Sequence, residues 1–67
     1  MKLLKCEWNC CLNKYEKMWL ADNTDELSAD FDPESAEGSI ILVISTEESY
    51  MKNTSGKWQK FGTTEVI

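Results

Sequence analysis

Short apolar stretches separated by polar, turn-forming residues run along this chain, a pattern typical of β-strands. The longest apolar run, residues 40 to 44, reads Ile-Ile-Leu-Val-Ile and lies between Gly38-Ser39 and the polar segment 45 to 48. An unbroken run rich in β-branched residues favours a strand that is buried on both faces. The pattern therefore predicts a central strand over residues 40 to 44, with the other elements arranged around it.

A three-stranded antiparallel meander is predicted over residues 40 to 61. Tyr50 and Met51 follow the first turn, and residues 53 to 56 form a second turn in which Gly56 can adopt a positive φ. Trp58 then lies on the returning strand. We expect Met51 and Trp58 to face each other across this hairpin. Residues 62 to 67 form a short tail.

Residues 1 to 20 fit two patterns. With a period of two, Leu4, Cys6 and Trp8 share one face of a strand, residues 9 to 13 form a turn, and residues 15 to 20 return as a second strand. A period of 3.6 also fits, because it places five residues on one side of a helix: Leu4, Trp8, Cys11, Tyr15 and Met18. The flanking asparagines and the aromatic content favour the hairpin, and a helix is the alternative.

Residues 21 to 39 are predicted to form an acidic connector. Asn23 or Thr24 can cap a single helical turn, and Asp32-Pro33 disfavours a longer helix. Leu27 and Phe31 are expected to pack this segment against the sheet. Its seven acidic residues, with no lysine among them, are Asp22, Asp25, Glu26, Asp30, Asp32, Glu34 and Glu37. The fold class predicted for residues 1 to 67 is one mainly β domain: a small antiparallel sheet of about five short strands, with an acidic loop or short helical turn between residues 21 and 39.

The length of 67 residues limits the core that this chain can bury, so we expect added support from a partner, a metal or disulfides. Cys6, Cys10 and Cys11 are odd in number and two are adjacent, which argues against a disulfide framework. Three thiols without histidine leave a structural zinc site incomplete. Reduced cysteines in a cytosolic protein, with support from oligomerisation or from docking onto a larger assembly, are therefore expected.

Asp30, Asp32 and Glu34 alternate as at the start of a calcium loop. Ser35 stands where that loop needs glycine, however, and Ile41 stands where it needs a bidentate glutamate. A solvated acidic connector is the better interpretation, and no metal or cofactor is expected.

The net charge of −5, with neither arginine nor histidine, excludes several classes of function. Binding to nucleic acid or to an anionic membrane normally needs a basic face. A cysteine nucleophile normally needs a neighbouring base such as histidine. No apolar run approaches the length of a membrane span, and the apolar stretch at the N-terminus is too short for a signal peptide. The sequence therefore predicts a non-enzymatic protein that stays where it is made.

One small sheet with one covering segment buries a single face, yet residues 40 to 44 are apolar on both. An exposed apolar face on a small protein indicates an interface. We expect this interface on the central strand and nearby aromatic residues, at Ile41, Val43, Tyr50 and Trp58.

The order of features from Leu20 to Phe61 resembles small structural proteins of tailed bacteriophages, of the head-fibre or capsid decoration type. The resemblance lies in the segment Leu-Ala-Asp-Asn-Thr-Asp-Glu-Leu from residue 20, the acidic spacer, Glu-Gly-Ser before an apolar strand, Tyr50-Met51, and the turn ending in Gly-Lys-Trp at residue 58. The Cys10-Cys11 pair departs from this pattern. The resemblance implies a non-enzymatic virion protein, made in the bacterial host cytoplasm, that binds capsid or other virion proteins as a homo-oligomer or in many copies.

A small acidic inhibitor or regulatory protein is the alternative. It would bind a basic surface of a host protein through the acidic connector. Salt distinguishes the two, because an acidic contact weakens steeply as salt rises and an apolar one does not.

Overall fold

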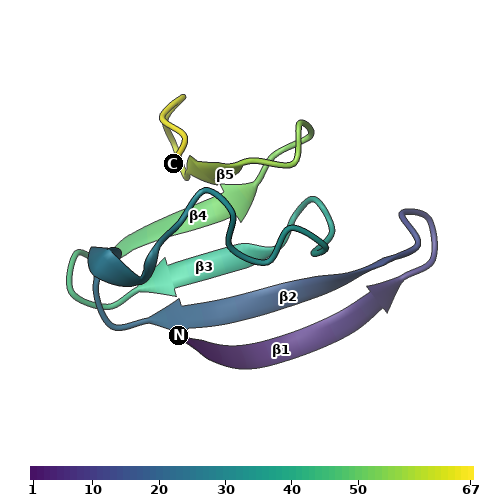
Figure 1. The fold of residues 1–67 in the computed structure, drawn as a ribbon, viewed down its shortest axis with the longest axis horizontal. Coiled ribbons are helices and arrows are strands. Elements are labelled where there is room, and N and C mark those ends of the chain that lie inside the picture. The colour runs from purple at the N-terminus through teal and green to yellow at the C-terminus, as the bar shows by residue number, and fades with distance from the viewer.

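The computed structural model describes residues 1–67 as one five-stranded sheet in the order β1-β2-β3-β4-β5 (Figure 1). The strands are β1 (Lys2–Asn9), β2 (Lys14–Ala21), β3 (Ile40–Val43), β4 (Glu48–Lys52) and β5 (Trp58–Lys60), and a 3-10 turn, η1 (Thr24–Glu26), follows β2. The mainly β fold class is confirmed. The N-terminal segment is a hairpin, and the alternative helix does not form.

One strand pair differs from the predicted antiparallel sheet. β2 and β3 run parallel, and the other three neighbouring pairs are antiparallel. Parallel neighbours need a crossover connection, because the chain must return to the end of the sheet where the first strand began. The connector between β2 and β3 makes this crossing over one face of the sheet (Figure 1).

The β1–β2 hairpin closes through its turn residues. The Asn9 side-chain oxygen accepts hydrogen bonds from the backbone N–H groups of Cys11 and Leu12, at 3.0 and 3.1 Å. Asn13 has φ +55°, a left-handed conformation that asparagine tolerates better than most residues. The turn predicted over residues 9 to 13 is confirmed.

The face beneath the connector carries the hydrophobic core. Ala21, Ile41, Val43 and Trp58 form its buried cluster, with Ala36 of the connector also fully buried. Leu27 and Phe31 pack against this cluster, as predicted, and the ring centroids of Phe31 and Trp19 lie 4.9 Å apart. The connector therefore serves as the second layer of a two-layer structure.

The start of the connector is capped as predicted. The Asn23 side chain accepts a hydrogen bond from the Asp25 N–H at 3.0 Å, so Asn23 is the N-cap of η1. The Glu26 carboxylate accepts hydrogen bonds from the N-terminal ammonium group and from the Asp22 and Asn23 N–H groups. These donors, the ammonium group first, hold the pKa of Glu26 below its ordinary value.

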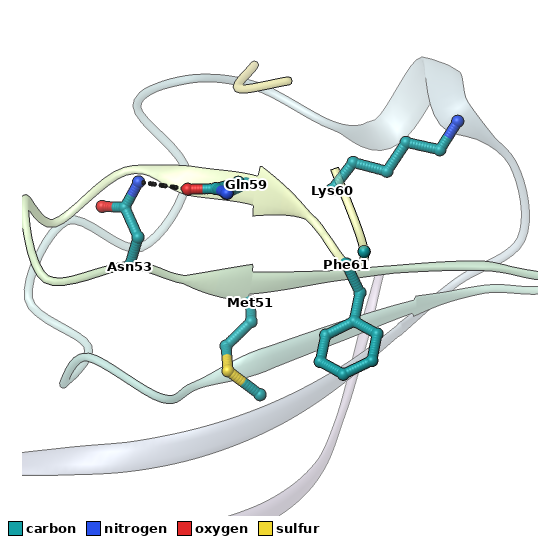
Figure 2. A pocket seen from close by; sticks show the side chains of 6 residues that line it. Met51, Asn53, Gln59, Lys60 and Phe61 are labelled. Atoms are coloured by element: carbon teal, nitrogen blue, oxygen red, sulfur yellow. Dashed lines mark hydrogen bonds between the residues drawn. The ribbon is translucent and has the colours of Figure 1, made fainter. Parts of the chain in front are cut away.

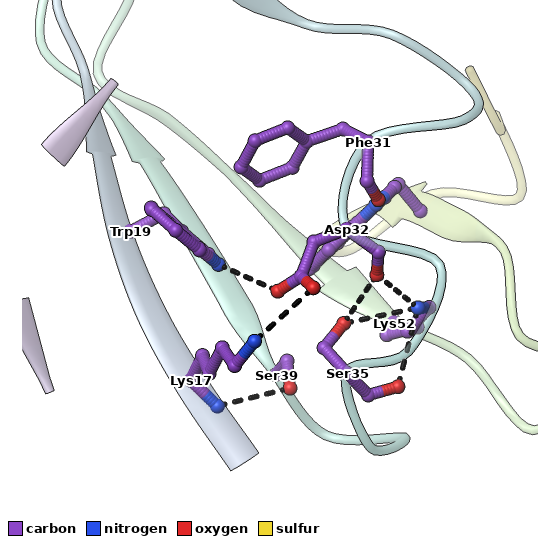
Figure 3. Close-up of polar contacts among 8 residues, drawn as sticks. Lys17, Trp19, Phe31, Asp32, Ser35, Ser39 and Lys52 are labelled. Atoms are coloured by element: carbon purple, nitrogen blue, oxygen red, sulfur yellow. Dashed lines mark hydrogen bonds and ion pairs between the residues drawn. The ribbon is translucent and has the colours of Figure 1, made fainter. Parts of the chain in front are cut away.

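A buried lysine fastens the middle of the connector to β4 (Figure 3). The Lys52 ammonium donates to the Asp32 carbonyl at 2.8 Å, and to the Ser35 carbonyl and hydroxyl at 3.2 and 2.9 Å. It also lies 5.4 Å from the centre of the Trp58 ring. Burial lowers the pKa of Lys52, and these acceptors offset part of the cost of removing the group from water.

Asp32 joins the connector to β2 through its side chain. Its carboxylate accepts hydrogen bonds from the Lys17 ammonium at 3.2 Å and from the Trp19 indole N–H at 3.1 Å (Figure 3). Its φ of +45° lies in the left-handed region, which residues other than glycine seldom adopt. This acidic residue is therefore part of the packing between connector and sheet.

We expect Asp32→Ala to lower the free energy of unfolding by about 1–3 kcal/mol, because the indole N–H and the ammonium group both lose their acceptor. Asp30→Ala is the matched control, since Asp30 is exposed in the same connector and its side chain makes no hydrogen bond. Its change should stay within about 0.5 kcal/mol. Urea denaturation followed by circular dichroism measures both, and equal losses would argue against this role of Asp32.

The second hairpin differs from the prediction by one residue. Trp58 faces Lys52, and Met51 faces Gln59, so Met51 and Trp58 do not form a cross-strand pair. The turn closes where the Asn53 N–H bonds to the Lys57 carbonyl at 2.8 Å, which fixes this register. A shift of one residue moves a side chain to the other face of the sheet. Trp58 therefore enters the core, and Met51 lies on the opposite face. Gly56 has φ +77°, as its predicted place in the turn requires.

The C-terminal residues lie along the outer edge of β5. The Lys60 N–H donates to the Glu65 carbonyl at 2.8 Å, and the Ile67 N–H donates to the Trp58 carbonyl at 3.0 Å. Gln59 and Val66 form an isolated antiparallel bridge. The predicted tail thus pairs with the edge strand of its own sheet.

Candidate binding surface on the open face of the sheet

The face opposite the connector carries apolar side chains with nothing packed over them. Met18, Ile40 and Met51 face one another across β2, β3 and β4, and Leu20 and Leu42 form the neighbouring pair. Phe61 follows β5 on the same side. We call this surface the open face; its residues are Met18, Leu20, Ile40, Leu42, Met51 and Phe61.

The open face is accessible to solvent over its whole width. Phe61 is 66% exposed and Leu42 is 37% exposed, although both are large and apolar. Met18, Leu20, Ile40 and Met51 are only partly buried by their neighbours in the sheet. A contiguous apolar surface of this kind on a small domain indicates contact with another molecule.

The surface is hollowed where β4 meets β5. Figure 2 shows Met51 and Phe61 pointing to the same side of these strands and Lys60 pointing away from them. Asn53 donates a hydrogen bond to the Gln59 side chain at 3.0 Å, which fixes the polar rim of the hollow. The Phe61 N–H donates to the Ser49 carbonyl at 2.8 Å, so the backbone beneath the exposed ring is anchored. The hollow therefore joins the apolar side chains of Met51 and Phe61 to a polar rim at one end of the open face.

The other border of the open face carries charges of both signs. On β1, Lys5 and Glu7 form an ion pair with 3.2 Å between Nζ and Oε1. Glu16 of β2 accepts a hydrogen bond from the Asn9 amide at 2.7 Å. An apolar centre with a mixed polar border matches the general anatomy of protein interfaces.

The predicted interface residues lie on the other face. Ile41 is 0% exposed and Trp58 is 1% exposed, and Val43 is also buried with them in the core. Tyr50 is partly buried against the same cluster, and its hydroxyl donates to the Glu48 carboxylate at 3.3 Å. The structure therefore places the predicted residues under the connector and offers their neighbours, Ile40 and Leu42, to solvent.

A continuous apolar run does not reveal which of its residues point to which face, so Ile41 and Val43 were predicted at the interface although the structure buries both of them in this chain. Met18 and Leu20 were missed for the same reason, since Trp19 and Ala21 between them are also apolar. The length of the turn after Asn53 is a signal in the sequence for the faces of the second hairpin. It places Met51 and Trp58 on opposite faces of the sheet.

Fewer carboxylates of the acidic connector are free to contact a partner than its composition suggests. Glu26 and Asp32 bond within the chain, and Glu37 approaches Lys14 with 3.9 Å between Oε1 and Nζ. The four that remain exposed are Asp22, Asp25, Asp30 and Glu34. Because Asp32 is turned toward Lys17 and Trp19, it does not share a site with Asp30 and Glu34.

The remaining candidate features are the cysteines, a metal site and a membrane-spanning helix. Cys6, Cys10 and Cys11 are exposed and carry free thiols. No three or more carboxylates or thiols converge in an arrangement that could hold a metal ion. None of the chain's helical segments has the length and apolar character needed to cross a membrane.

Comparisons with protein-family models, with curated proteins and with solved structures found no match to this chain.

Proposed function

We propose that this chain is a non-enzymatic structural protein of a tailed bacteriophage that attaches to the virion through its open face, as a capsid decoration or head-fibre-type protein. The observation that carries the proposal is the open face itself. A row of apolar side chains crosses three strands of the sheet without any cover from the chain. The bacteriophage assignment is supported by the resemblance of residues 20 to 61.

The size of the domain supports attachment to a larger assembly. Only eight residues are buried, and five of these are hydrophobic, so the core is small for a stable domain. Contact with a partner that binds only the folded chain adds stability that the free domain lacks. Copies joined in an oligomer would compensate for a modest affinity at each contact with a symmetric shell.

The acidic inhibitor is the second candidate and is less well supported. Three of the seven acidic residues of the connector are engaged by donors of the same chain. A nucleic-acid mimic needs a dense array of free carboxylates, and the remaining four are spread over the connector.

Co-sedimentation tests the proposal. The labelled chain is mixed with particles of a phage that encodes it, prepared with its gene deleted, at low and at high salt. We expect saturable binding that persists at high salt, because burial of apolar surface is not screened by ions. Binding to particles that disappears as salt rises would contradict attachment through an apolar surface. Absence of binding at either salt concentration would overturn the virion assignment.

A further inference from the structure

The two edge strands of the sheet differ in whether another segment of the chain pairs with their outer side. The outer edge of β5 is paired with the C-terminal tail. β1 is the other edge strand, and β2 is its only neighbour. Seven of its eight residues are exposed, Leu3, Leu4 and Trp8 among them. An uncovered edge strand presents free N–H and C=O groups to any strand that can pair with it.

We propose that β1 pairs with β1 of a second copy of this chain, antiparallel about a two-fold axis, to give a continuous ten-stranded sheet with Cys6 facing its own copy at the axis. This inference does not depend on the proposed function, because it concerns the outer edge of β1 and uses none of the six open-face residues.

Two-fold symmetry restricts the register. When two identical edge strands pair antiparallel in a closed dimer, the axis is perpendicular to the sheet and one residue faces its own copy. An axis at Lys5 sets two lysines against each other, and an axis at Glu7 sets two glutamates against each other. Like charges directly opposite are destabilising. An axis at Leu4 or Trp8 overlaps a shorter segment of the two strands.

An axis at Cys6 is the register that satisfies the charges. Each Lys5 then faces Glu7 of the second copy, so two opposite-charge pairs form, one on either side of the axis. Leu4 and Trp8 are also set opposite each other, and both are exposed in the single chain, at 47% and 52%. The existing Lys5–Glu7 ion pair shows that these two side chains lie on the same face of β1.

The charged residues of β1 also disfavour pairing with an unrelated strand, which agrees with an axis at Cys6. Two lysines, Lys2 and Lys5, lie on the strand. Lysines on edge strands discourage unspecific pairing. A second copy supplies Glu7 at the position where Lys5 needs it, whereas an unrelated strand does not.

Charge exchange tests the register by sedimentation over a concentration series up to the millimolar range. We expect the unaltered chain to dimerise, and Lys5→Glu or Glu7→Lys to weaken dimerisation roughly tenfold, since each sets like charges opposite each other twice. An equal mixture of the two variants should dimerise again, because each Glu then faces a Lys. A monomeric unaltered chain, or a mixture no better than its components, would overturn the proposal.

Oxidation with diamide provides a second test. Two Cys6 thiols at the axis join into a disulfide, losing two protons and two electrons to diamide, and facing residues of antiparallel strands lie within the range that a disulfide spans. A chain that retains only Cys6, with Cys10→Ser and Cys11→Ser, should cross-link roughly tenfold faster than one that retains only Cys10. Equal rates would contradict an axis at Cys6.

Discussion

Trp58→Ala should unfold this protein at room temperature. Trp58 is 1% exposed at the centre of the core, and its indole N–H donates to the Phe31 carbonyl of the connector at 2.8 Å. Removing a buried tryptophan costs about 3–5 kcal/mol. In a chain of fewer than about 70–80 residues, a single hydrophobic core rarely supplies more than about 3–5 kcal/mol of stability. The loss therefore consumes most or all of the stability.

Trp8→Ala is the matched control for this prediction. Trp8 is on β1 and is half-exposed, and its main contact is the ring of Tyr15, with centroids 4.9 Å apart. Such a pair contributes about 1 kcal/mol, so the control should remain folded. Thermal and urea unfolding followed by far-ultraviolet circular dichroism compare the two variants. A folded Trp58→Ala chain, or a control that loses as much stability, would contradict the described core.

Ile41→Lys and Leu42→Lys should differ in their effect on folding, although the two residues are adjacent. Ile41 is fully buried beneath the connector, so a lysine there places an uncompensated ammonium group in the core and should unfold the chain. Leu42 lies on the open face, where the new ammonium group reaches water. That variant should remain folded within about 1 kcal/mol and lose at least about tenfold in affinity for phage particles.

Thr54→Lys supplies the control for the added charge. Thr54 is exposed in the turn between β4 and β5 and is not one of the open-face residues. We expect both folding and co-sedimentation with particles to be unchanged. If Leu42→Lys binds particles at full affinity, the open face is not the contact surface. The assignment to the virion would still stand. A folded Ile41→Lys chain would instead mean that the two faces are assigned the wrong way round.

Local chemistry explains why most strands could be predicted from the sequence. The apolar run from Ile40, the turn at Asn53 to Gly56 and the asparagines around the cysteines all act over a few residues, and each is borne out by the structure. The cap at Asn23 belongs to the same class, because its side chain bonds to a backbone group two residues away.

The pairing of β2 with β3 depends on contacts that a local pattern does not contain. The parallel arrangement requires the connector to cross the sheet, and the crossing is held by Lys52 and Asp32, which meet only after folding. Leu27 and Phe31 pack on the sheet as predicted, whereas Asp32, expected to be one solvated acid among seven, bonds to Lys17 and Trp19. A carboxylate followed by proline gives no sign of a distant indole partner.

The pairing of the C-terminal residues with β5 has a consequence for the size of any assembly built through sheet edges. A sheet with two free edges can add copies at both ends and grow into a fibre, as cross-β structures do. Here the Ile67 and Lys60 N–H groups are already bonded within the chain, so only the β1 edge remains to receive a neighbour. Once that edge is occupied by a second copy, both outer ends of the joined sheet are closed by tails. If β1 pairs with a second copy as proposed, growth along the sheet should stop at two subunits, and concentrated protein should resist fibrous aggregation.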